Sequence, residues 1–248
     1  MSLSHSRMPE GNPRPSCLPV LAESGLHEFF AEHEADSAAP GALALMLAAG
    51  SRDGAWLWVR HEPQGRETGL PYPSGLAELG LSPAAVLFFR AQDVASALQA
   101  GLEGARCAAL GAVIIELRGE AKAYDLVASR RLSLAGRTCG VPVVMVRLGA
   151  SPVPSAAHTR WQVRALPSRP LAAKAPGPPG FELSLLRARN GREGVLIHVE
   201  WDRDARQFIP RSPLGTDLPA RRAAPVSGAV VPVPLHRPGA PDVWRHAG

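Results

Sequence analysis

Lysine is almost absent from this 248-residue chain, which holds only Lys122 and Lys174 beside 25 arginines. A phosphate-binding loop of the G-x-x-x-x-G-K-[ST] type follows the first strand of an α/β nucleotide-binding core, and its lysine contacts the terminal phosphates. No lysine precedes residue 122. The first half of the chain therefore cannot contain a loop of this type.

Cysteine and long apolar runs are also scarce. The three cysteines, Cys17, Cys107 and Cys139, are far apart and form no C-x-x-C pair, so we expect free thiols in a reducing cytosol rather than disulfides or a zinc site. Cys107 and Cys139 adjoin apolar runs and are predicted to be buried. The N-terminal segment is polar and broken by prolines, unlike a signal peptide. The longest apolar run, Ala42–Ala49, is far shorter than the ~20 residues of a membrane span. We predict a cytoplasmic protein without membrane contact.

The overall composition is that of a globular protein with a basic surface. Hydrophobic residues make up 46% of the chain, enough for one sizeable core domain. The net charge of +5 favours acidic partners such as DNA, RNA or an acidic protein surface. The alternative is that the preference for arginine over lysine reflects a GC-rich genome and no acidic partner exists.

Apolar runs recur about every 30 residues, at 55–59, 86–90, 112–117 and 141–146. Helical patterns separate the later runs, one opened by Asp93 and one burying Leu132 with Arg130 and Arg137 on the solvent side. A further helix is expected after Asp36 or Ser37, either of which could cap it, and a short one at 74–81. Apolar strands joined by helical crossovers predict a parallel sheet covered on both faces.

The C-terminal third has a different character. A shorter strand is expected at Trp161–Ala165, followed by a linker at 171–180 and a hairpin over 181–201 that turns at Asn190-Gly191. Residues 203–248 hold eight prolines and seven arginines against three acidic residues and are predicted to be a flexible tail. The predicted domains are a loose segment at 1–24, a core at 25–202 and this tail, which either orders on a partner or stays passive.

The order of several segments resembles the RecA-like superfamily and, within it, the ImuA-type mutagenesis accessory proteins. GLHEFFAEHEAD (25–36) with the following GALALMLAA stands where the family has strand, phosphate loop and helix. GAVIIELRG stands at the Walker-B-like strand. The remaining resemblance is carried by AWLWVRHE, LPYPSGLAELGLSPAAVLFFRAQD, ASRRLSLAGRTCGVPVVMVR, PSAAHTRWQVRALPS and FELSLLRARNGREGVLIHVEW. The resemblance implies a RecA-like, mostly parallel α/β sheet flanked by helices, with a C-terminal β-hairpin.

The resemblance breaks down at the nucleotide site. The loop candidate Phe29–Asp36 has neither glycine nor lysine, and four carboxylates, those of Glu28, Glu32, Glu34 and Asp36, fall within nine residues. A phosphate about 6 Å from one of them would be repelled by roughly 3 kcal/mol. The Walker-B-like strand ends in Glu116 instead of aspartate, and His61 or Glu62 lies near the family's catalytic glutamate or in an ordinary exposed loop. We therefore expect a degenerate core that is not an enzyme and takes no cofactor.

Other catalytic and metal motifs are missing from the sequence. HEFFAEHE lacks the second histidine of H-E-x-x-H, because His33 is six residues from His27. Neither G-x-S-x-G nor G-x-G-x-x-G occurs. We expect no metal site.

Six arginines are the candidates for a basic surface that contacts a DNA backbone or a partner: Arg118, Arg130, Arg131, Arg137, Arg147 and Arg160. The alternative for Arg130 and Arg137 is that they only solvate a helix. Trp161, next to Arg160, is expected in the core rather than as a platform for base stacking.

What the resemblance implies is an accessory of SOS-induced translesion DNA synthesis. Its expected partners are an ImuB-type protein and an error-prone C-family DNA polymerase, with RecA and a weak DNA contact as further candidates. Two alternatives remain open, a cell-division inhibitor of the SulA type and a divergent RecA-like ATPase that uses arginine in place of lysine.

Overall fold

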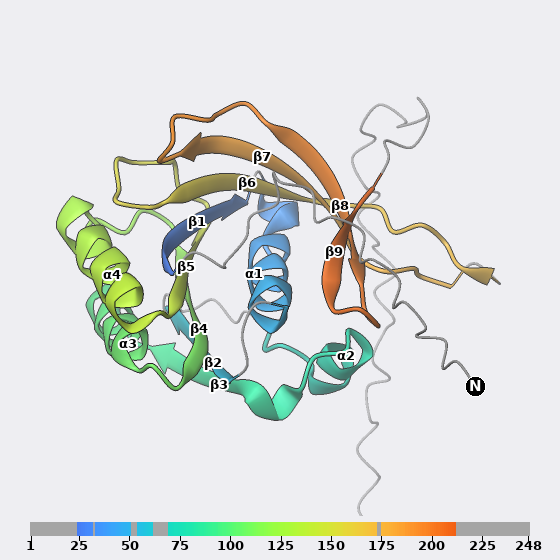
Figure 1. Cartoon of the computed structure of the whole chain (residues 1–248), viewed down its shortest axis with the longest axis horizontal. Helices are drawn as coiled ribbons and strands as arrows, with labels where there is room; N and C mark the ends of the chain where they lie inside the picture. The colour runs from blue at the N-terminus through green and yellow to red at the C-terminus, as the bar shows by residue number, and fades with distance from the viewer. Residues whose placement is uncertain (1–23, 32, 51–53, 62–68, 173–174, 212–248) are drawn as a thin grey trace, which may run out of the picture. The chain divides into compact units, whose positions relative to one another are not determined.

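One nine-stranded sheet organises the molecule, in the order β3-β2-β4-β5-β1-β6-β7-β8-β9 (Figure 1). The computed structural model describes residues 24–31, 33–50, 54–61, 69–172 and 175–211. The first six strands are parallel, and β7, β8 and β9 continue the sheet antiparallel. The strands are β1 Gly25–Ala31, β2 Ala55–His61, β3 Val86–Ala91, β4 Leu110–Arg118, β5 Pro142–Leu148, β6 Thr159–Leu166, β7 Gly180–Ala188, β8 Leu196–Asp202 and β9 Gln207–Pro210.

Helices cover both faces of the parallel strands. Helix α1 (Ala39–Ala49) packs on one face against β1, β4, β5 and β6, whereas α3 (Val94–Arg106) and α4 (Leu126–Cys139) pack on the other. The shorter elements are α2 (Pro73–Glu78) and the 3-10 turns η1 (Glu34–Asp36) and η2 (Pro83–Ala85). The prediction of a mostly parallel α/β sheet flanked by helices, with antiparallel C-terminal strands, is confirmed.

Local capping explains where the two long crossover helices begin. The carboxylates of Asp93 and Asp125 accept hydrogen bonds from the backbone N–H groups of Ser96 (2.7 Å) and Ala128 (2.8 Å). Helix α1 has no such cap, so the expected capping by Asp36 or Ser37 is wrong. Asp36 instead turns toward the sheet.

The C-terminal hairpin forms as predicted, from β7 and β8. The sheet then continues past the expected end of the core, because β9 pairs with β8 and buries Phe208 against Trp201 and Phe181. The prediction of a flexible tail from residue 203 is therefore wrong for residues 207–210. Residues 212–248 of that tail, and residues 1–23 of the loose segment predicted at 1–24, lie outside the described residues.

Two apolar clusters, one on each face of the sheet, form the core. Trp161 is buried in the α1-side cluster, as predicted. Cys139 is half-buried, but Cys107 is exposed at the C-terminal cap of α3, so its predicted burial is wrong. Among the described residues, no helix is both long and apolar enough to cross a membrane.

Candidate functional site

A pocket of about 380 Å³ lies between α1 and the C-terminal ends of β2 and β4. Most of its wall is apolar and comes from α1, α2 and the turn after α2, with Leu45, Met46, Leu76, Leu79 and Leu81 as its larger side chains. Its charged lining residues are Arg60, Glu116 and Arg118. The pocket is the candidate site because it combines a largely apolar cavity with a few convergent charged groups.

Glu116, at the end of β4, is the central charged group of this pocket. Its carboxylate forms an ion pair with Arg60 Nε at 3.1 Å and accepts a hydrogen bond from Trp58 Nε1 at 3.2 Å. Burial raises the pKa of Glu116, and the neighbouring charge of Arg60 opposes that rise only in part. Arg60 Nη1 in turn donates to the Gly69 carbonyl at 2.7 Å. Glu116 is therefore held by protein groups on two sides.

Trp58 lies directly against the first half of α1. A Cβ atom at Gly41 would come within 2.9 Å of Trp58 Cζ2, so only glycine allows the ring to pack at this point of the helix. Because the same ring donates to Glu116, the helix, the indole and the carboxylate form one packed unit. Gly41 and Trp58 both line the pocket, so this packed unit forms part of its wall.

The described acidic residues between β1 and α1, Glu34 and Asp36, both have partners within the protein. Glu34 forms an ion pair with Arg118, and Asp36 is buried and accepts from the Ala165 N–H at 3.1 Å. Glu32 and Glu62 lie outside the described residues, and His61 ends β2. Glu28 belongs to β1 rather than to this loop, so the expected cluster of four loop carboxylates is not formed as predicted.

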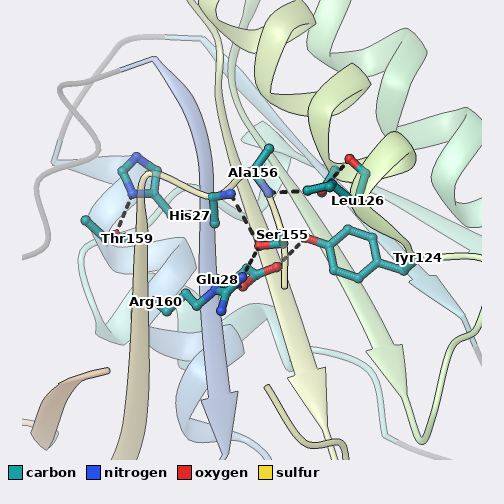
Figure 2. A network of polar contacts seen from close by, with 10 residues as sticks. His27, Glu28, Tyr124, Leu126, Ser155, Ala156, Thr159 and Arg160 are labelled. Atoms are coloured by element: carbon teal, nitrogen blue, oxygen red, sulfur yellow. Dashed lines mark hydrogen bonds and ion pairs between the residues drawn. The ribbon is translucent and has the colours of Figure 1, made fainter. Parts of the chain in front are cut away.

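Glu28 anchors a second buried cluster on the opposite face of the sheet (Figure 2). Its carboxylate accepts a hydrogen bond from the Tyr124 hydroxyl and forms an ion pair with Arg160 Nε at 2.8 Å. Burial and the adjacent negative charge of Glu28 raise the pKa of Tyr124 well above 10.0, so the phenol remains a donor. The network joins β1, the loop before α4 and β6.

The loop between β5 and β6 is fastened to the same cluster. Arg160 Nη2 donates to Ser155 Oγ at 2.8 Å, and the Ala156 N–H donates to Ser129 Oγ of α4 at 3.0 Å (Figure 2). The guanidinium of Arg147 lies 5.3 Å from the Tyr124 ring centroid and is almost fully buried. Arg160 therefore pairs with the Glu28 carboxylate, whereas Arg147 packs on the Tyr124 ring that donates to it.

The six arginines selected from the sequence do not form one surface. Arg130, Arg131 and Arg137 are exposed on α4, as the helical period predicts, and Arg118 lines the pocket beside Glu34. Arg147 and Arg160 are buried, which corrects the expectation that they belong to the same exposed face. They lie inside because they alternate with apolar residues on strands covered by α4 and the β5–β6 loop.

Sequence reasoning missed Arg60, Trp58 and Tyr124 as site residues. The sequence could have indicated Arg60, because a charged residue inside the apolar strand AWLWVRH needs a partner of opposite charge when it is buried. The same argument applies to Glu28 in GLHEFFA. No local pattern marks Tyr124, whose partner is 96 residues away. Within the described part of the chain, no three His, Cys, Asp or Glu side chains gather as metal ligands.

Comparison with known proteins gives weak similarities only. No protein-family model matches the chain, and no curated protein matches it in sequence. Among solved structures, SulA from Pseudomonas aeruginosa is similar with a TM-score of 0.36 and 22% identity, over 50% of this chain and 98% of that chain. The RadB recombinase is similar with a TM-score of 0.49 and 15% identity, over 77% of this chain and 92% of that chain. Similarity at this level identifies neither a family nor a function.

Proposed function

We propose that this protein is a non-catalytic, RecA-like accessory of damage-induced mutagenesis that acts by binding partners in the cytoplasm. The sequence resemblance to ImuA-type proteins supports the biological role. The arrangement around Glu116 supports the absence of catalysis. The expected partners remain an ImuB-type protein, an error-prone DNA polymerase and RecA, with a weak contact to DNA.

The observation that carries the non-catalytic part is the pairing of Glu116 with Arg60 and Trp58. A carboxylate that holds a magnesium ion presents its oxygens to the metal and to water. Here the oxygens of Glu116 face a guanidinium and an indole N–H, and Glu34 and Arg118 pair across the adjoining loop. Together with the missing loop lysine, this arrangement disfavours a nucleotide phosphate beside α1.

Nucleotide binding tests this part directly. We expect titration calorimetry of the full chain with magnesium ATP to give no saturable heat up to millimolar nucleotide, and no phosphate release above a protein-free blank. Saturable binding that disappears in Glu116→Ala but persists in the control Glu103→Ala, an exposed residue on α3, would contradict the proposal and favour a divergent ATPase.

Partner recovery tests the accessory role. The tagged full chain is purified from DNA-damaged cells, and we expect mass spectrometry to identify an ImuB-type protein or an error-prone polymerase above an untagged control. A truncation after Arg211 keeps β9 paired with β8 and tests whether residues 212–248 contact the partner protein. Recovery of only the division-ring protein, together with filamentation on overexpression, would point instead to division inhibition.

A further inference from the structure

A second, smaller pocket lies where β6 begins and β7 ends. It has a volume of about 140 Å³ and is lined by Ser155, Ala156, Ala157, Arg160, Arg187 and Arg189. Arg160 and Arg187 are opposite each other in the antiparallel pairing of β6 with β7. The Arg189 N–H donates to the His158 carbonyl at 2.8 Å and holds the end of β7 beside the pocket. Strand pairing thus brings three arginines to one small cavity.

Positive charge around this pocket exceeds negative charge. No acidic residue is among its lining residues in the described part of the chain. Arg187 and Arg189 are exposed, and their side chains make no ion pair or hydrogen bond with any described residue. Behind the wall, Glu28 is the carboxylate that balances Arg160, while the Nε and Nη1 atoms of buried Arg147 have no hydrogen-bond partner there. The pocket is therefore suited to an anion.

Arg160 is already oriented before any ligand arrives. Its Nε is paired with Glu28 at 2.8 Å, and its Nη2 donates to Ser155 Oγ at 2.8 Å. Ser155 Oγ also accepts from the Ala157 N–H at 3.3 Å, which fixes the hydroxyl in turn. A guanidinium held on two of its three nitrogens loses little conformational freedom when it binds an oxyanion.

We propose that this pocket binds one phosphate group of a nucleic-acid backbone. Its volume is that of a few water molecules, enough for a tetrahedral oxyanion but too small to enclose a nucleoside as well. Arginine forks match phosphate oxygens in a bidentate geometry. Because the sugar and base would lie outside the pocket, the contact positions a strand without reading its sequence.

Exposed arginines continue from the pocket onto α4. The Ala156 N–H donates to Ser129 Oγ at 3.0 Å, so the helix lies directly beside the loop that lines the pocket. Arg130 and Arg131, next in sequence, are exposed. A chain of phosphates seated in the pocket could meet these side chains at neighbouring positions, whereas an isolated phosphate ion could not. This continuity favours a nucleic-acid backbone as the source of the phosphate.

The test measures the binding of a fluorescein-labelled, mixed-sequence single-stranded oligonucleotide to the full chain by anisotropy, across a series of salt concentrations. We expect Arg187→Ala/Arg189→Ala to weaken binding about tenfold or more at low salt and to flatten the salt dependence. The matched control, Arg106→Ala/Arg203→Ala, removes two exposed charges elsewhere and should change affinity far less. Arg187→Lys/Arg189→Lys keeps the positive charge but removes the two parallel N–H donors of each guanidinium, so it tests whether bidentate binding is required. The melting temperature of each variant shows whether it is folded.

Two results would overturn the proposal. Equal weakening in the alanine variant and the charge-matched control would mean that binding follows net charge and not the pocket. Unchanged oligonucleotide affinity, with an inorganic-phosphate-induced rise in melting temperature that only Arg187→Ala/Arg189→Ala loses, would assign the pocket to free phosphate. The inference rests on the weak DNA contact of the proposed function, whereas partner recovery tests the accessory role independently of this pocket.

Discussion

The two buried glutamates, Glu28 and Glu116, have similar partners but opposite surroundings. Each pairs with an arginine from a neighbouring strand and accepts from one aromatic donor. Glu28 is sealed between β1 and the loop before β6, whereas Glu116 lines an open pocket at the end of β4. The Glu28 carboxylate therefore joins segments of the fold, whereas the Glu116 carboxylate lies where a ligand in the pocket could reach it. The sequence pattern marked Glu116 as special and placed Glu28 in a loop.

The largest effect is expected from Glu28→Ala. Removing the carboxylate leaves Arg160 buried without its ion-pair partner, which should lower the free energy of unfolding by about 3–5 kcal/mol. Urea denaturation followed by circular dichroism measures this free energy. The control is Glu103→Ala, which removes only an exposed ion pair on α3 and should change the free energy of unfolding little. A loss for Glu28→Ala no larger than that of the control would break the comparison.

Tyr124→Phe should have an intermediate effect. The variant keeps the ring against Arg147 but removes the hydroxyl that donates to Glu28, which should cost about 1.5–3 kcal/mol of stability. The same denaturation experiment applies. Tyr72, an exposed tyrosine, provides the matched Tyr→Phe control, which should leave stability unchanged. If both variants behaved alike, the hydrogen bond to Glu28 would not contribute to stability.

Glu116→Gln should show the smallest effect, visible as a change in pH dependence. Burial raises the pKa of Glu116 above its ordinary value of 4.5, so the folded protein binds this proton more tightly than the unfolded chain. The resulting stability is fully present below pH 4.5 and is lost as pH rises through the raised pKa. Unfolding free energies measured from below pH 4.5 up to neutral pH should fall less steeply in Glu116→Gln than in the wild type. Parallel curves would show that Glu116 is not perturbed.

Local sequence patterns predicted most helices and strands of this fold. The partners of its buried polar side chains depend instead on which strands pair across long sequence distances. Asp93 opens α3 as the sequence indicates, because the capping contact reaches only three residues. Arg130 and Arg137 are exposed because the helical period places them opposite Leu132. Strand β9 was missed because the four residues of QFIP offer no periodicity, and Phe208 becomes buried only through Trp201 and Phe181.

The candidate site was only partly predictable for the same reason. Glu116 stands out at the end of an apolar run, but its partners come from β2, 58 residues earlier in the chain for Trp58. Asp36 reads as a helix cap, yet its carboxylate reaches the Ala165 N–H across 129 residues. Partners at such separations are set by strand order, which no local spacing encodes.

The Glu28 network also has a consequence for the order of events in folding. Its hydrogen bond with Tyr124 closes a stretch of 96 residues, and its ion pair with Arg160 joins β1 to β6, which follows it only after four other strands in the chain. Interactions of this kind form late, because the entropy of closing long loops is lost before they contribute. We therefore expect Glu28→Ala to accelerate unfolding far more than it slows refolding in stopped-flow denaturant jumps. The Glu28 network would then lengthen the lifetime of the folded state by slowing its unfolding.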